Sequence, residues 1–321
     1  TLLRKAQIQL KRLEKALREK SEEFDSVIKM GRTQLQDAVP IRLGQEFHAY
    51  ASAISRDIKR FDTAKEEIRS LNMGGTAIGT GLNADSTYFH RVVKNMSSIT
   101  GEELVQSYDT IDATQNLDSY AMVSGIVKSC AVNLSKMCND LRLMSSGPRT
   151  GFCEINLPAK QNGSSIMPGK INPVIPEVVN QVAFNIIGND VTITMAAEAG
   201  QLELNAFEPI IFYNLFESIQ TLSNAVQTLV DNCIVGITAN EEHCRKMVEG
   251  SIGIITAICP YVGYETAANI AKEALRTNNS VRDLILQKKL LTEEQLKTIL
   301  DPYTMTKPGI QGRNPADLLA D

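Results

Sequence analysis

The sequence has few of the residues that metal-dependent and nucleophilic enzymes use. Only three histidines occur in 321 residues, and there is no HExxH helix, no Cys/His metal spacing and no GxSxG elbow. These absences argue against metal-dependent hydrolysis, against a dedicated metal site and against acyl transfer by a serine triad. His48, His90 and His243 lie outside the loops that break the helical pattern, so we interpret them as surface or structural residues.

Long apolar runs and an excess of one charge are also missing. No stretch of 18 apolar residues occurs, no signal peptide opens the chain, and the most apolar uncharged stretch, residues 178–189, carries three asparagines and a glutamine. The net charge is −4, with Lys and Arg scattered along the chain. We therefore expect a cytoplasmic protein that binds neither nucleic acid nor membranes.

Cysteine is sparse and lacks redox or metal spacing. The six cysteines form no CxxC pair and lie mostly in apolar helical stretches, which is typical of buried free thiols in a reducing compartment. They are Cys130, Cys138, Cys153, Cys233, Cys244 and Cys259.

Helical periodicity fills most of the chain instead. Apolar residues recur every three or four positions over long stretches, and convincing alternating strands are absent. The expected long helices cover residues 3–27, 43–71, 123–144, a stretch from Pro176 onward, and 210–234. The stretch from Pro176 is apolar on nearly every face, which favours packing between subunits of an oligomer. The predicted fold class is all-α.

The helices become short after the stretch GITAN, residues 236–240. Residues suited to helix N-termini mark their starts: Thr292 with Gln295 can form a capping box, and Ser280 can cap the stretch VRDLI that follows it, residues 281–285. We predict a bundle of long helices in residues 1–240, followed by a small helical C-terminal domain in residues 241–321.

Three loops interrupt the helical pattern. Residues 29–45 contain GRTQ, residues 72–83 are glycine-rich, and residues 145–173 form a 29-residue connection of the length expected for a functional or disordered loop. The glycine-rich stretch has neither GxGxxG nor a Walker lysine, and no strand precedes it, so nucleotide binding is not expected.

The stretch GSSIMPGKIN, residues 163–172, has the composition of an anion site. Lys170 offers a positive charge and Asn172 an amide two residues away, so both can face one ligand in an extended segment. Gly163 and Gly169 leave backbone N–H groups free to point inward. From composition alone, a carboxylate site and a flexible linker both remain open.

Four stretches resemble conserved segments of the aspartase/fumarase superfamily: GRTQLQDAVPIRLGQ, GGTAIGTGLN, CNDLRLMSSGPR and GSSIMPGKIN. The resemblance runs through essentially the whole chain. Members of the superfamily eliminate ammonia, water or an amine from succinyl compounds to release fumarate. The resemblance implies a homotetramer whose active sites combine loops from three subunits, and it implies no organic cofactor.

Two features favour the aspartase branch, which deaminates L-aspartate to fumarate and ammonia. Fumarases carry histidine in the fourth place of GRTH, where this chain has Gln34, and residues 176–205 resemble aspartases more than fumarases. A class II fumarase and a non-catalytic structural relative remain as alternatives.

The resemblance also implies roles for individual residues. Ser164 would be the general base that removes a proton from C3 of L-aspartate, giving an aci-carboxylate intermediate. Thr33, Ser165, Lys170 and Asn172 would hold the substrate carboxylates. Gln34 is expected at the substrate in place of the histidine. Glu177 matches a glutamate that fumarases pair with that histidine, so without it we interpret Glu177 as a helix-terminal residue.

The family has an N-terminal domain and a Ser-Ser/Thr-Asn loop that would precede Thr1. We expect this chain to lack both, and therefore to form the bundle but to have little or no activity alone.

Overall fold

The computed structural model describes residues 1–161, 167 and 170–310. The predictions for Gly163, Ser164, Ser165 and Gly169 lie outside the described residues. The helical fold class is confirmed, because helices make up most of the described chain and the strands are few and short.

The long helices follow the predicted periodicity. They are α1 (Leu2–Glu23), α2 (Leu43–Glu67), α5 (Asp118–Met144), α6 (Val174–Glu198) and α7 (Glu208–Asn232). The shorter helices are α3 (Ser86–Thr100), α4 (Asp112–Gln115), α8 (Glu241–Gly250), α9 (Ile255–Val262), α10 (Tyr264–Thr277), α11 (Val281–Gln287) and α12 (Glu293–Ile299). Strand pairs are β1 (Ile28–Thr33) with β2 (Gln36–Arg42), β3 (Ser70–Leu71) with β4 (Val105–Gln106), and β5 (Ile155–Asn156) with β6 (Thr238–Ala239).

The chain divides into two compact units. The first consists of Thr1–Ala16, Tyr50–Arg142 and Pro158–Val235. The second consists of Leu17–Ala49, Leu143–Leu157 and Gly236–Asp321. The separation into residues 1–240 and 241–321 stays a prediction.

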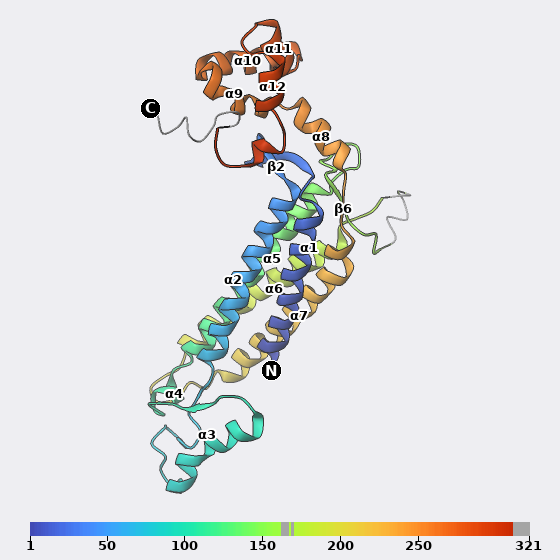
Figure 1. The fold of residues 1–321 in the computed structure, drawn as a ribbon. Coiled ribbons are helices and arrows are strands. Elements are labelled where there is room, and N and C mark those ends of the chain that lie inside the picture. The colour runs from blue at the N-terminus through green and yellow to red at the C-terminus, as the bar shows by residue number, and fades with distance from the viewer. Residues whose placement is uncertain (162–166, 168–169, 311–321) are drawn as a thin grey trace. The chain divides into compact units, whose positions relative to one another are not determined.

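The first unit is a bundle in which α6, α7 and the larger parts of α1, α2 and α5 lie side by side (Figure 1). Their apolar faces form its core, and polar contacts fix neighbouring helices. Gln7 of α1 donates to the Ile58 carbonyl of α2 at 2.9 Å. The fully buried Asp57 of α2 accepts hydrogen bonds from Asn133 of α5 at 2.8 and 3.0 Å. Because a buried carboxylate is costly unless paired, the contact favours an arrangement in which Asp57 of α2 faces Asn133 of α5.

The second unit contains a β-hairpin that the sequence analysis did not predict. Residues 28–42 were expected only to interrupt the helices, yet β1 and β2 pair there in antiparallel fashion. The pairing shifts register between Met30 and Arg32. At this shift a Cβ on Gly31 would lie 2.6 Å from the Val39 carbonyl oxygen, so glycine allows the two backbones to approach.

An apolar cluster supports the hairpin inside the second unit. Met30 of β1 packs with buried side chains of α8 and of α9 to α12, the short helices coloured orange and red in Figure 1. The predicted caps of these helices are confirmed: Thr292 and Gln295 form a capping box, and Ser280 Oγ accepts from the Asp283 N–H. The short helices thus bury the side of the hairpin that carries Met30.

All six cysteines are free, as predicted, although only four of them are buried. Cys153 and Cys259 are partly exposed. Burial raises the pKa of Cys138 well above its ordinary range and that of Cys233 to about 12, so both thiols stay protonated at neutral pH. Within the described residues, no helix is long and apolar enough to cross a membrane.

Candidate functional site

The turn of the β1–β2 hairpin carries two of the predicted site residues. Thr33 pairs with Gln36 across a two-residue turn made of Gln34 and Leu35. Both turn residues have left-handed backbone conformations, with φ of 53° and 62°. Such values fit the two-residue turns that match the twist of a hairpin, but they cost a residue other than Gly, Asn or Asp about 1–2 kcal/mol. Thr33 and Gln34 are therefore exposed on a turn whose backbone the surroundings must stabilise.

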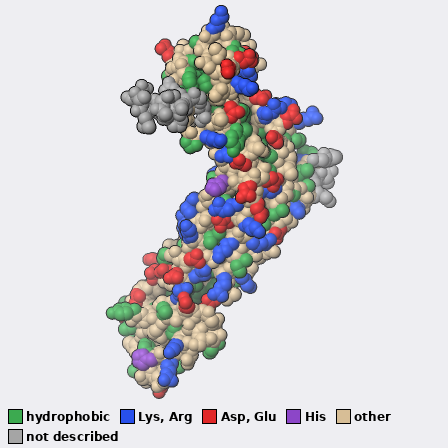
Figure 2. All heavy atoms as spheres, viewed as in Figure 1, with side chains coloured by type: hydrophobic (Ala, Val, Ile, Leu, Met, Phe, Trp, Pro, Cys, Tyr) green, Lys and Arg blue, Asp and Glu red, His purple; other side chains and the backbone are tan. Residues whose placement is uncertain are grey.

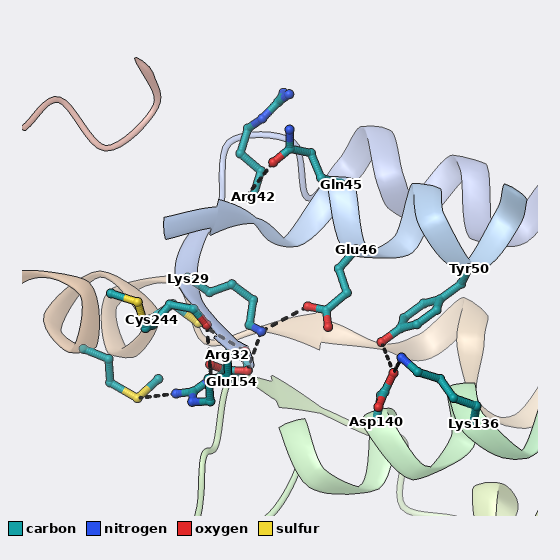
Figure 3. A network of polar contacts seen from close by, with 12 residues as sticks. Lys29, Arg32, Arg42, Gln45, Glu46, Tyr50, Lys136, Asp140, Glu154 and Cys244 are labelled. Carbon is teal, nitrogen blue, oxygen red and sulfur yellow. Dashed lines mark hydrogen bonds and ion pairs between the residues drawn. The ribbon is translucent and has the colours of Figure 1, made fainter. Parts of the chain in front are cut away.

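A buried ion pair lies directly next to this turn. Arg32 precedes Thr33, and its Nη1 lies 2.5 Å from Oε1 of Glu154, whose side chain is 0% exposed (Figure 3). The guanidinium also covers the ring of Phe152, at 4.1 Å from Cζ to the ring centroid. Since Arg presents a planar, permanently charged fork, it suits both contacts at once.

Lys29 completes the network from the same strand. Its Nζ lies 3.0 Å from Glu46 Oε2 and 3.1 Å from Glu154 Oε2. Burial by itself disfavours the charged amine, but the two carboxylates outweigh it, so the pKa of Lys29 lies above its ordinary value. Two cations and two anions therefore meet around Glu154, with Lys29 and Glu154 buried and Arg32 and Glu46 partly exposed.

The segment that carries Glu154 is held through its backbone. The Glu154 N–H donates to the Met144 carbonyl at 2.8 Å, and its carbonyl accepts from the Asn240 N–H at 2.9 Å. The buried Cys244 thiol lies 3.6 Å from the same carbonyl (Figure 3). Burial, with a smaller contribution from the Glu154 charge, raises the pKa of Cys244 to about 12, so this sulfur is not a nucleophile at neutral pH.

Lys170 and Asn172 precede helix α6 in the first unit. The Lys170 side chain is exposed, and its backbone N–H donates to the Met167 carbonyl at 3.3 Å. Asn172 is half-buried, and its carbonyl accepts from the Val174 N–H at 2.9 Å. The lysine side chain is thus accessible from solution.

Glu177 lies in the first turn of α6, where the helix dipole favours an acidic side chain. Its Oε1 lies 3.6 Å from Arg142 Nη2, and both side chains are about 40% exposed. A surface pair of this kind contributes at most about 1 kcal/mol. The contact agrees with the interpretation of Glu177 as a helix-terminal residue.

The structure brings the predicted residues together in two pairs. Thr33 and Gln34 share the hairpin turn of the second unit, and Lys170 and Asn172 share the segment before α6 in the first unit. Among the described residues, no group of three His, Cys, Asp or Glu side chains could hold a metal ion.

Arg32 and Glu154 were not predicted as site residues from the sequence. The only sequence signal was a single acidic residue within the otherwise uncharged stretch FCEINL, which a buried, paired carboxylate would explain.

A cavity of about 720 Å³ in the first unit contains none of the predicted residues. It lies among the N-terminal turn of α1 and residues of α2, α5 and α7. Charges in its wall are already paired, as in Arg4 with Glu102 at 2.8 Å and Lys65 with Asp62 at 2.7 Å. It therefore offers a ligand mainly apolar contacts.

Comparison with known families finds two matches. A family model described as Lyase matches residues 2–188, and a model described as Fumarase C C-terminus matches residues 254–307. The first covers more than half of the chain.

Similar proteins and structures agree with these models. Aspartate ammonia-lyase from Bacillus subtilis is 55% identical over 97% of this chain, and that from Helicobacter pylori is 55% identical over 93%. A cobalt-bound crystal structure of a fumarate lyase:delta crystallin from Brucella melitensis superposes with a TM-score of 0.92 at 49% identity, covering 96% of this chain and 66% of that one. A class II fumarase from Schistosoma mansoni gives a TM-score of 0.89 at 32% identity, covering 94% and 66%. The chain spans 66% and 64% of the lengths of the two aspartate ammonia-lyases.

Proposed function

The chain belongs to this lyase family, and from that premise we propose that its protein is a carbon–nitrogen lyase that converts L-aspartate reversibly to fumarate and ammonia. The observation that carries the proposal is the 55% identity to proteins named aspartate ammonia-lyase over nearly the whole chain, against 32% to a class II fumarase. Gln34, exposed on the hairpin turn, supports the same choice because it replaces the histidine of fumarases.

In the proposed reaction Ser164 removes a proton from C3 of L-aspartate. If the hydroxyl pKa lies roughly six units too high for neutral pH, forming the alkoxide costs about 8 kcal/mol, at roughly 1.4 kcal/mol per unit. Backbone N–H groups and the Lys170 ammonium would have to offset that cost.

Loss of the C3 proton places a second negative charge on the adjacent carboxylate. Thr33, Ser165, Lys170 and Asn172 would accelerate the step to the extent that they bind this aci-carboxylate more tightly than the substrate carboxylate. The C2–N bond then breaks, the electron pair leaves with nitrogen, and ammonia and fumarate are released. The exposure of Lys170 supports this role, because an anion from solution can reach its side chain.

We propose that the protein works as a homo-oligomer in the cytoplasm, and specifically as a homotetramer. An apolar stripe on α6 supports the assembly: Phe184, Val191 and Met195 are 62%, 56% and 66% exposed and follow a heptad-like spacing. In contrast, acidic and basic side chains intermingle over the face in Figure 2, which suits contact with water.

The reaction is tested by following the absorbance of fumarate as it forms, with the protein produced as its gene encodes it. L-aspartate and L-malate are supplied in parallel, with Ser164→Ala as the comparison. Fumarate from aspartate alone, with turnover reduced by orders of magnitude in Ser164→Ala and an unchanged oligomeric state, is the expected result. Fumarate from malate would instead identify a fumarase, and no product from either substrate would favour a structural relative. The expectation that residues 1–321 alone are inactive stays a prediction that the same assay checks.

A further inference from the structure

We propose that Glu154 is a positioning residue for this reaction: through Arg32 it holds the Gln34–Leu35 turn in the conformation that presents Thr33 and Gln34 to the substrate. The inference rests on the proposed function and adds a residue that does not touch the substrate. It follows from three observations on the second unit.

The first observation is the burial of the Glu154 carboxylate. Its side chain is 0% exposed and its Arg32 partner 12%. Removing one partner of such a pair leaves an uncompensated charge and typically costs several kcal/mol, whereas an exposed pair contributes at most about 1 kcal/mol. The position of the Arg32 guanidinium is therefore strongly constrained.

The second observation is the conformation of the turn. Left-handed backbone at Gln34 and Leu35 persists only where the surroundings overdetermine it. Arg32 is the last side chain on β1 before Thr33, and it is fixed on both sides: Glu154 lies at its Nη1, and the Phe152 ring lies 4.1 Å from its Cζ. Only the backbone of Thr33 lies between the fixed Arg32 side chain and the Gln34–Leu35 turn, the tip of the hairpin, so the turn has little conformational freedom.

The third observation is that Glu154 is itself the fixed end of the contact. Both its N–H and its carbonyl are in backbone hydrogen bonds, to Met144 and Asn240. Lys29 also pairs with Glu46, at 3.0 Å, so it retains a carboxylate partner in the Glu154→Gln variant. Loss of the Glu154 charge therefore acts chiefly on Arg32 and the turn.

The experiment compares Glu154→Gln with Asp57→Asn in the protein as its gene encodes it. Asp57 is the matched control because it is also 0% exposed and pairs with Arg60 at 2.8 Å, but it lies on α2 in the first unit. Glu154→Gln is expected to lower kcat/KM for L-aspartate about 100-fold, as expected for a displaced binding group. Asp57→Asn is expected to stay within twofold of wild type per folded molecule.

A second measurement separates positioning from general destabilisation. If Glu154 acts only through Thr33 and Gln34, adding Glu154→Gln to the Thr33→Ala, Gln34→Ala double variant should cause no further loss of activity, whereas independent losses would multiply. Hydrogen exchange of the peptide covering residues 31–36 should speed up about tenfold in Glu154→Gln and stay unchanged in Asp57→Asn.

Unchanged exchange at the tip, or multiplicative losses in the triple variant, would overturn the proposal. If Glu154→Gln does not fold, Arg32→Lys serves instead, since lysine keeps the charge but loses the planar fork and the ring contact. The exchange measurement needs no turnover. Normal wild-type folding with no fumarate from aspartate would therefore refute the proposed function, while the exchange result still decides the positioning role.

Discussion

Arg32 Nη1 lies 2.5 Å from Glu154 Oε1, although 122 residues separate the two in the chain. The contact joins the β1–β2 hairpin to the segment after α5 within one compact unit. Bringing such distant residues together costs loop-closure entropy, which this pair alone would not offset. Packing of Met30 against the C-terminal helices provides the apolar burial that makes the ion pair possible.

Replacing Leu35 by glycine should stabilise the protein. Leu35 is 62% exposed and has a φ of 62°, so it gains little burial and its backbone is strained. Relief of about 1–2 kcal/mol should exceed the entropy that glycine loses on folding, about 0.5–1 kcal/mol. Urea unfolding should show a higher midpoint. Val132→Gly, at a 49% exposed position inside α5, should lower it, and a lower midpoint for Leu35→Gly would contradict the prediction.

Replacing Gly31 by alanine should destabilise the hairpin. The new Cβ would meet the Val39 carbonyl oxygen at 2.6 Å, so one strand must move. We expect a loss of about 1–3 kcal/mol, measured by urea unfolding. Gly125→Ala is the control, since its Cβ would meet nothing within 4 Å inside α5 and should stabilise by about 0.5–1 kcal/mol. Equal effects from the two substitutions would show that the close approach at Gly31 is unimportant.

The helices could be predicted from the sequence because the buried face of a helix leaves a local pattern, in which apolar residues recur every three or four positions. The pattern from Val123 to Met144 and the start of α6 near Pro176 both correspond to helices in the structure. The prediction from sequence failed at the hairpin, because Gln34–Leu35 lacks the Asn-Gly or Asp-Gly signature of two-residue turns. A register shift beside it also breaks the alternation of the strands.

The site was predictable only in part for a similar reason. Thr33 and Lys170 lie in local stretches with recognisable composition. Arg32 and Glu154 become a pair only through tertiary folding, and nothing local to either residue identifies the other. Their burial is a property of the folded unit, in which Glu154 is 0% exposed.

Stability should fall in alkaline solution through Lys29. Its pKa is raised in the folded state above the unfolded value of 10.5, so the charged amine stabilises the fold fully below pH 10.5. That contribution is lost as the pH rises through the folded-state pKa. The difference in unfolding free energy between wild type and Lys29→Met should therefore be constant from pH 8 to about 10 and shrink above pH 10.5. If the difference in unfolding free energy instead grew as the pH rose, the prediction would be wrong in sign.

A charge on the α6 stripe should weaken self-association. Phe184 is 62% exposed in the single chain and shares a helix face with Val191 and Met195, so an assembly that covers this face would bury all three. Burying an unpaired lysine ammonium in place of the ring is unfavourable by several kcal/mol per site. Because every subunit of a symmetric oligomer carries the substitution, the cost is repeated at each copy of the interface.

Light scattering after size-exclusion chromatography measures the effect. Wild type should elute as an oligomer. Phe184→Lys should already dissociate at protein concentrations at least tenfold higher than those at which the wild type dissociates. Ile99→Lys is the control, because Ile99 is 83% exposed on α3 and outside the stripe. It should leave the mass unchanged. Circular dichroism of Phe184→Lys should retain the wild-type helical signal, since the substitution removes no contact from the core of the bundle. A monomeric wild type, or equal dissociation of both variants, would show that the α6 stripe does not mediate assembly.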